Sequence, residues 1–237
     1  MVVHSLSDFN FIEGEVLLFD KPLYWTSFDL VSKVRYTISK NLGKKKIKVG
    51  HAGTLDPLAT GLIIICTGKK TKEIELYQAT EKEYIAELFI GATTPSFDRE
   101  TEINQQFETN HISEALIRKT LEKFVGEIQQ LPPSYSAKKI DGQRAYLKAH
   151  KGIEVAMKPS TVNIYENEFL SFSNQILKIK IRCSKGTYIR SLANDIGKAM
   201  HTGAYLYNLQ RTKVGNFNIE QAMKIEDFVL DSIAVTA

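Results

Sequence analysis

The most constraining feature of the sequence is the apolar run LIIIC, Leu62–Cys66. A strand with one face in water alternates apolar and polar residues, whereas an unbroken apolar run is typical of a strand buried on both faces. The run therefore predicts a central strand of a sheet. A loop of small residues, GHAGTLDPLATG at Gly50–Gly61, comes directly before it and contains one histidine, His51, and one carboxylate, Asp56.

The remaining periodic segments predict strands and helices without strict βαβ alternation. Strands are expected at Val16–Phe19, at residues 83–91 and at residues 176–183, the last with apolar and basic residues alternating. Helices are expected at residues 27–42, 113–128 and 188–200, the first because Thr26 and Asp29 match a capping box and Gly43 suits the position after the helix. We therefore expect an α+β fold with a central mixed, largely antiparallel sheet flanked by helices.

Length and composition indicate a soluble globular chain. The 237 residues are 43% hydrophobic and 24% charged, which favours one domain spanning residues 1–237. No apolar stretch is long enough to span a membrane, and the N-terminus does not resemble a signal peptide. Cys66 and Cys183 lie far apart in apolar runs, as expected of core residues in a reducing compartment. We expect a cytoplasmic protein.

Positive charge is mild overall but locally concentrated. The net charge is +4 and the sequence pI about 8.8, which does not establish nucleic-acid binding. One cluster, Lys44, Lys45, Lys46 and Lys48, directly precedes the glycine loop; a second comprises Lys178, Lys180, Arg182, Lys185 and Arg190. Each cluster is either a solvated face or a surface for phosphates.

Several common chemistries lack their motifs. The chain has no GxxxxGK[ST] phosphate loop, since TGKKT at residues 67–71 lacks the upstream glycine, and no GxGxxG or GxSxG. Its five histidines and two cysteines show no metal-ligand spacing. We therefore expect no metal and no cofactor.

What remains is a carboxylate site. Asp56 precedes Pro57, which favours an extended backbone, and a carboxylate can serve as nucleophile, general base or stabiliser of charge at an anomeric carbon. A simple turn role for Asp56 stays open. A glycosidase would need a second carboxylate, and the candidates are Asp20, Asp98, Asp141 and Asp195. Arg190 falls in the first turn of its helix, where a cation is unfavourable without an anionic partner.

The loop Gly50–Gly61 closely resembles the signature of the bacterial tRNA pseudouridine synthase B (TruB) family. Further segments similar to family motifs cover most of the chain: DKP and TSF at residues 20–28, KEY at 82–84, GATTPSFD at 91–98, PPSYSAKKIDGQRAY at 132–146, CSKGTYIRSLANDIG at 183–197 and LQRTKVGNF at 209–217. The resemblance implies the pseudouridine-synthase fold and isomerisation of uridine 55 in the tRNA T-loop, without cofactor. It also implies a thumb-like RNA-contacting insertion near residues 131–152.

The resemblance implies a role for each matching residue. Asp56 matches the catalytic aspartate, His51 the histidine that wedges into the T-loop, Tyr84 the tyrosine that stacks on the flipped uracil, and Arg190 the arginine that pairs with the aspartate. Lys21 and Leu209 match a pocket lysine and an apolar pocket residue. The candidates for contacts to the RNA backbone are Lys44, Lys45, Lys46, Lys48, Lys138, Lys139, Arg144, Lys185 and Arg211.

Three departures from the family pattern stand out. Tyr24 occupies a position that usually holds glycine, His150 one that usually holds arginine, and the chain ends soon after residues 225–228, which predicts no C-terminal PUA-type domain. We expect a monomer that binds the tRNA T-arm without an obligate protein partner or a membrane. Asp56 could attack C1′, abstract a proton at C2′ in a glycal route, or add to C6 of the uracil. We favour an action of Asp56 at the ribose. A non-catalytic T-loop-binding module and a synthase acting on another RNA are the alternatives.

Overall fold

The computed structural model describes residues 9–43, 46–135, 139–140, 143–144 and 157–228, which divide into two compact units. Unit 1 comprises residues 1–83 and 210–237, and unit 2 comprises residues 84–209. Of the residues singled out from the sequence, Lys44, Lys45, Lys138 and His150 lie outside the described residues. No described helix is long and apolar enough to cross a membrane. The expectation of a single catalytic domain stays a prediction.

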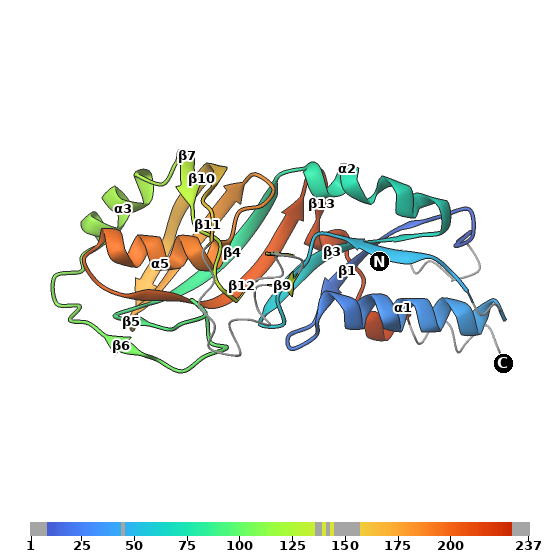
Figure 1. Cartoon of the computed structure of the whole chain (residues 1–237), viewed down its shortest axis with the longest axis horizontal. Coiled ribbons are helices and arrows are strands. Elements are labelled where there is room, and N and C mark those ends of the chain that lie inside the picture. The colour runs from blue at the N-terminus through green and yellow to red at the C-terminus, as the bar shows by residue number, and fades with distance from the viewer. Residues whose placement is uncertain (1–8, 44–45, 136–138, 141–142, 145–156, 229–237) are drawn as a thin grey trace. The chain divides into compact units, whose positions relative to one another are not determined.

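Unit 1 is built around strand β3, Ala59–Thr67, which contains the apolar run Leu62–Cys66 (Figure 1). β3 pairs antiparallel with β1, Val16–Lys21, and with β2, Val49–Ala52. The strand order in this unit is β1-β3-β12, and β12, Ala204–Val214, also pairs with β13, Phe217–Asn218. The η2 turn, Gly68–Glu73, and helix α2, Ile74–Ala79, follow β3.

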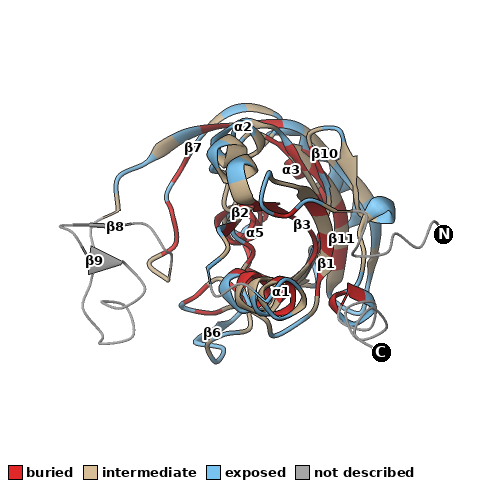
Figure 2. Cartoon of the chain, turned by 90° about the vertical axis from the view of Figure 1, so that its right-hand side faces the viewer, coloured by how far each residue is buried: buried red, intermediate tan, exposed pale blue. Residues whose placement is uncertain are grey.

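The prediction that β3 is buried on both faces is confirmed (Figure 2). Ile63 and Ile65 pack into one apolar cluster with helix α1, Ser27–Asn41, while Leu62, Ile64 and Cys66 pack into a second cluster. The predicted capping box of α1 is also present: the Thr26 hydroxyl accepts from the Asp29 backbone N–H, and the Asp29 carboxylate accepts from the Thr26 N–H. The rigid strand thus carries the loop that precedes it.

Unit 2 holds the strands in the order β12-β4-β11-β10-β7. Their bounds are β4 Lys82–Ile90, β7 Gly126–Gln130, β10 Ser160–Ser173 and β11 Ile176–Cys183. The described helices of the unit are α3, Glu114–Glu122, and α5, Ile189–Ala199. Short antiparallel pairs join β5, Ala92–Thr93, to β6, Gln105–Gln106, and β8, Lys139–Ile140, to β9, Gln143–Arg144.

The predicted α+β class with a largely antiparallel sheet is confirmed. The pairs β7–β10 and β10–β11 are antiparallel, and the alternation predicted for residues 176–183 buries Leu177, Ile179, Ile181 and Cys183. The helix predicted over residues 113–128 is too long, because α3 ends at Glu122 and β7 begins at Gly126, whose φ of 100° is incompatible with helix. Within the predicted thumb-like insertion near residues 131–152, the described residues include the β8–β9 pair.

Candidate active site

The loop that carries Asp56 is fastened to the start of α1. Ser27 Oγ accepts a hydrogen bond from the Leu55 N–H at 2.9 Å and donates to the Leu55 carbonyl at 3.1 Å. On the other side of Asp56, the Tyr24 N–H donates to the Pro57 carbonyl at 2.8 Å. The Asp56 carbonyl itself accepts from the Ala59 N–H at 3.0 Å. The half-buried Asp56 is therefore held on a fixed backbone.

Lys21 is a buried cation whose charge is coupled to Asp56. Its side chain is 0% exposed, and Nζ donates to the carbonyls of Pro22 at 2.9 Å and Trp25 at 2.6 Å. Burial lowers the pKa of Lys21 to about 8; the negative charge of Asp56 opposes that shift, and the positive charge of Arg211 adds to it. The predicted pocket lysine thus interacts electrostatically with the predicted catalytic carboxylate.

Arg211 corrects one of the sequence predictions. Only 1% of it is exposed, and its guanidinium donates to the Leu62 carbonyl at 2.7 Å and to the Gly53 carbonyl at 3.1 Å. A contact to an RNA phosphate needs an exposed cation, so this side chain does not fit the predicted role. Instead Arg211 joins β12 to two segments on either side of Asp56. Gly53 lies in the loop before Asp56, and Leu62 lies on β3 after it.

His51 lies on β2 opposite Ile65 of β3, and its side chain is half-buried. Burial is the main cause that lowers the pKa of His51, and the positive charge of Arg211 lowers it further. A hydrogen bond with the Gly53 backbone opposes the shift. The imidazole is therefore neutral at pH 7. A neutral ring at the rim of the loop suits insertion between stacked bases, because it brings no charge that would have to be desolvated.

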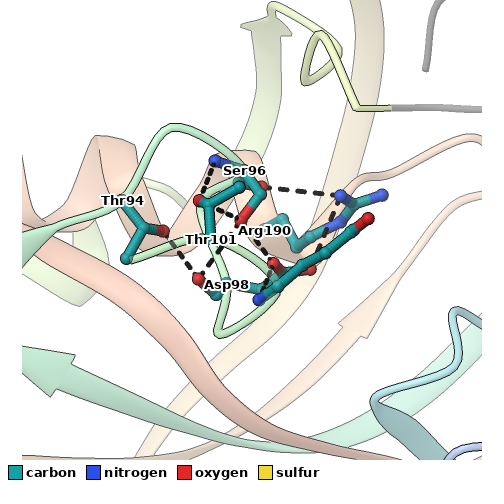
Figure 3. Close-up of polar contacts among 6 residues, drawn as sticks. Thr94, Ser96, Asp98, Thr101 and Arg190 are labelled. Carbon is teal, nitrogen blue, oxygen red and sulfur yellow. Dashed lines mark hydrogen bonds and ion pairs between the residues drawn. The ribbon is translucent and has the colours of Figure 1, made fainter. Parts of the chain in front are cut away.

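Unit 2 provides the anionic partner expected for Arg190 (Figure 3). Arg190, in the first turn of α5, places Nη1 3.5 Å from Asp98 Oδ2, and both side chains are 6% exposed. Asp98 is itself fixed, since its Oδ1 accepts from Ser96 Oγ at 2.6 Å and its carbonyl accepts from Thr94 Oγ1 at 2.6 Å. The ion pair explains a cation at a helix N-terminus. The pairing of Arg190 with Asp56 stays a prediction.

The six predicted pocket residues are shared between the two units. Asp56, His51 and Lys21 belong to unit 1, and Tyr84, Arg190 and Leu209 to unit 2. Tyr84 is 8% exposed near the start of β4, and Leu209 is half-buried on β12. Their roles in one pocket stay predictions.

The described part of the first basic cluster, Lys46 and Lys48, lines a hollow of about 400 Å³ in unit 1. Lys46 and Lys48 line it together with Lys69 and Lys72, which the sequence predictions missed. The Gly68 N–H donates to the Lys48 carbonyl at 2.9 Å, so the TGKKT segment lies against the cluster. The TGKKT segment does not fit the phosphate-loop motif, but its two lysines are the sequence signal for a basic surface here.

The second basic cluster is largely neutralised. Its ion pairs are Lys178–Glu87 at 3.2 Å, Lys180–Glu168 at 2.7 Å and Arg182–Glu166 at 3.1 Å. A cation beside a carboxylate attracts phosphate weakly, so these ion pairs favour the solvated-face interpretation for Lys178, Lys180 and Arg182. Lys185 is exposed beyond β11 and keeps its predicted role, as do Lys139 and Arg144, which pair across β8 and β9.

Comparison with known proteins gives the family. Residues 40–189 match the model of the TruB family pseudouridylate synthase (N terminal domain), and residues 190–235 match that of the tRNA pseudouridylate synthase B C-terminal domain. The chain belongs to the TruB family. A tRNA pseudouridine synthase B of Phocaeicola vulgatus is 57% identical over 92% of this chain and 93% of its own length. Another, of Parabacteroides distasonis, is 53% identical over 94% and 97%.

Solved structures support the same fold. A chain in the structure of an H/ACA RNP bound to a substrate RNA containing 2'-deoxyuridine matches with a TM-score of 0.65 and 26% identity, over 92% of this chain and 52% of that chain. A Cbf5-Nop10-Gar1 complex matches with a TM-score of 0.67 at 23% identity, over 98% of this chain and 66% of that chain. The TruB-family protein therefore has the predicted pseudouridine-synthase fold.

Proposed function

We propose that this TruB-family protein is a tRNA pseudouridine synthase that isomerises uridine 55 of the T-loop. The observation that carries the proposal is the Gly50–Gly61 loop, whose aspartate is held on both sides by backbone hydrogen bonds and interacts electrostatically with a buried lysine. Relatives at 57% and 53% identity are named tRNA pseudouridine synthase B, which supports the same reaction here.

A uridine inside a folded T-loop is stacked, so the enzyme must extrude it before any chemistry. Extrusion costs a few kcal/mol in lost stacking and pairing. Stacking of the uracil on Tyr84 recovers about 1–3 kcal/mol of that cost. The neutral imidazole of His51 fills the space that the base leaves.

Asp56 acts on the extruded nucleotide, through attack at C1′, a glycal route or addition to C6. In each case the N1–C1′ bond breaks, the uracil rotates, and a C5–C1′ bond forms. A base then removes the C5 proton, and N1 gains a proton, so the product is an isomer and no cofactor is consumed. The negative charge of Asp56 helps to keep the buried Lys21 protonated, and Arg190 is proposed to pair with Asp56.

The lysine-lined hollow provides the RNA-binding charge of unit 1. Lys46, Lys48 and Lys72 are exposed there, while Lys69 is paired with Glu13 at 2.6 Å. Contacts of these cations with phosphates release counterions, so affinity should fall with rising salt. We also propose that the protein binds the T-arm of tRNA and acts as a monomeric, cytoplasmic enzyme.

The reaction is tested with unmodified tRNA transcript tritiated at uridine C5. Wild-type protein should release tritium from one uridine per molecule, and mapping of the product should place pseudouridine at position 55. A transcript with cytidine at position 55 is the matched control and should release none. Binding of the transcript without release would indicate a non-catalytic module, and release from another position would contradict the substrate assignment.

A further inference from the structure

Tyr24 combines two unfavourable features. Its φ is 67°, in the left-handed region that L-residues with bulky side chains rarely adopt, and its side chain is 71% exposed. A large aromatic side chain that is neither buried nor in a relaxed backbone conformation contributes nothing to the core. Such an outlier points to a role outside folding.

The backbone around Tyr24 is held firmly, so this conformation is imposed by its neighbours. Buried Lys21 binds the carbonyls of Pro22 and Trp25, and the Tyr24 N–H donates to the Pro57 carbonyl at 2.8 Å. Two residues further on, Ser27 fastens the same segment to Leu55. Tyr24 is therefore attached by one hydrogen bond to the residue directly after Asp56.

Two further apolar side chains of this segment are exposed. Leu23 is 36% exposed, and Phe28, at the first turn of α1, is 67% exposed. We call Leu23, Tyr24 and Phe28 the apolar rim. Three side chains are too few for a stable protein–protein interface, which requires some twenty residues on each side. A nucleobase is the right size for such a surface, and each base offers a flat π-face to an aromatic ring.

We propose that Tyr24 stacks on an unpaired nucleobase of the RNA loop, next to the uridine on which Asp56 acts. The inference rests on the proposed function, because it requires an RNA loop bound at Asp56. Stacking on single-stranded bases is tolerant of sequence and adds affinity where a loop has been opened. Tyr24 would hold a neighbouring base, whereas Tyr84 is proposed to hold the target uracil.

Three substitutions separate stacking from backbone effects. Tyr24→Phe keeps the ring and should bind a T-arm stem-loop within about twofold of wild type, whereas Tyr24→Ala should bind at least about fivefold more weakly. Tyr24→Gly removes the ring and also relieves the positive φ, so its melting temperature should rise while its RNA affinity falls. A purely structural residue would not give these opposite changes.

Tyr36→Ala is the matched control, since Tyr36 is a 64% exposed tyrosine on α1 outside the rim. It should leave RNA affinity unchanged. Stacking is read directly with a stem-loop that carries 2-aminopurine in place of one loop purine: wild type and Tyr24→Phe should quench its fluorescence on binding, and Tyr24→Ala and Tyr24→Gly should not.

Unchanged affinity and quenching in both Tyr24→Ala and Tyr24→Gly would overturn the inference. A change in sedimentation of Tyr24→Ala without a change in RNA affinity would overturn it too, because the rim would then be a protein-binding surface. If instead the proposed function is wrong, the wild-type protein will release no tritium from the labelled tRNA. The relative affinities of the Tyr24 variants are measured independently of that outcome.

Discussion

Arg190 and Asp98 form a buried ion pair, with 3.5 Å between Nη1 and Oδ2 and 6% of each side chain exposed. Lys69 and Glu13 are closer, at 2.6 Å, but are 70% and 60% exposed. Burial rather than distance decides how much the loss of each pair lowers the free energy of unfolding. Water screens exposed charges, whereas a buried charge whose neighbouring carboxylate is removed is poorly solvated.

Asp98→Asn should therefore lower the free energy of unfolding by about 3 kcal/mol, because it removes the charge beside a buried guanidinium and keeps the shape of the side chain. Glu13→Gln removes the exposed pair and should cost less than about 1 kcal/mol. Urea denaturation of both variants makes the comparison. Equal losses would show that the Arg190–Asp98 pair has no special weight.

Gly61→Ala should be severely destabilising. Gly61 has a φ of 105°, and an added Cβ would lie 2.6 Å from the backbone nitrogen of Arg211, inside van der Waals contact. Gly43 is the control, since it has a φ of 61° and nothing within 4 Å of an added Cβ. Gly43→Ala should cost about 1 kcal/mol from its backbone conformation alone, and Gly61→Ala at least about 3 kcal/mol.

Similar melting temperatures for Gly61→Ala and Gly43→Ala would contradict the close approach of β3 and β12 in unit 1. A loss of activity in Gly61→Ala is expected as well, since Arg211 also binds the Gly53 carbonyl in the loop that carries Asp56.

Lys21 makes stability depend on pH. Its pKa is about 8 in the folded protein against the usual 10.5, so between these values the unfolded chain binds a proton that the folded chain does not. The free energy of unfolding therefore rises with pH across this window, and below about 8 the full cost of burying the charge is present. The rise amounts to about 3 kcal/mol.

Lys21→Met removes this dependence. Urea denaturation of wild type and variant between about pH 7 and pH 10.5 should show the wild-type curve rising relative to that of the variant. Parallel curves would contradict the buried, partly neutral lysine.

Ser27→Ala tests whether the Asp56 loop needs its anchor. The substitution removes both hydrogen bonds to Leu55 from a site that is 3% exposed, which should cost about 1–3 kcal/mol. Because Asp56 follows Leu55 directly, kcat should fall more than KM rises. Thr26→Ala removes the neighbouring helix cap at about 1 kcal/mol and should leave kcat near wild type. Equal losses of kcat would mean that general destabilisation explains the effect.

Local signals in the sequence predicted the elements that depend on local physics. The Thr26–Asp29 capping box and the Leu62–Cys66 run both appear as predicted, because a helix cap and a doubly buried strand are determined by few neighbouring residues. The α3 prediction ran too far because its apolar spacing continues past Glu122, and Gly126 was the signal for the turn into β7.

Long-range contacts were beyond such signals. An arginine is a residue type that often contacts RNA, so the sequence alone favoured that role for Arg211. Its burial in unit 1 depends on hydrogen bonds to Leu62 and Gly53, some 150 residues away in sequence. Likewise, the cations of β11 alternate outward as predicted, but their carboxylate partners lie on β4 and β10. The identity of Asp56 as the candidate catalyst came from the family resemblance, since one aspartate before a proline is chemically ambiguous.

In the proposed function, Asp56 performs the chemistry and is not needed for binding. The direct measurement is tritium release from C5-labelled tRNA by Asp56→Asn, alongside the affinity of the same variant for that tRNA. We predict affinity within a fewfold of wild type and no release above background. Release at the wild-type rate by Asp56→Asn would contradict the account.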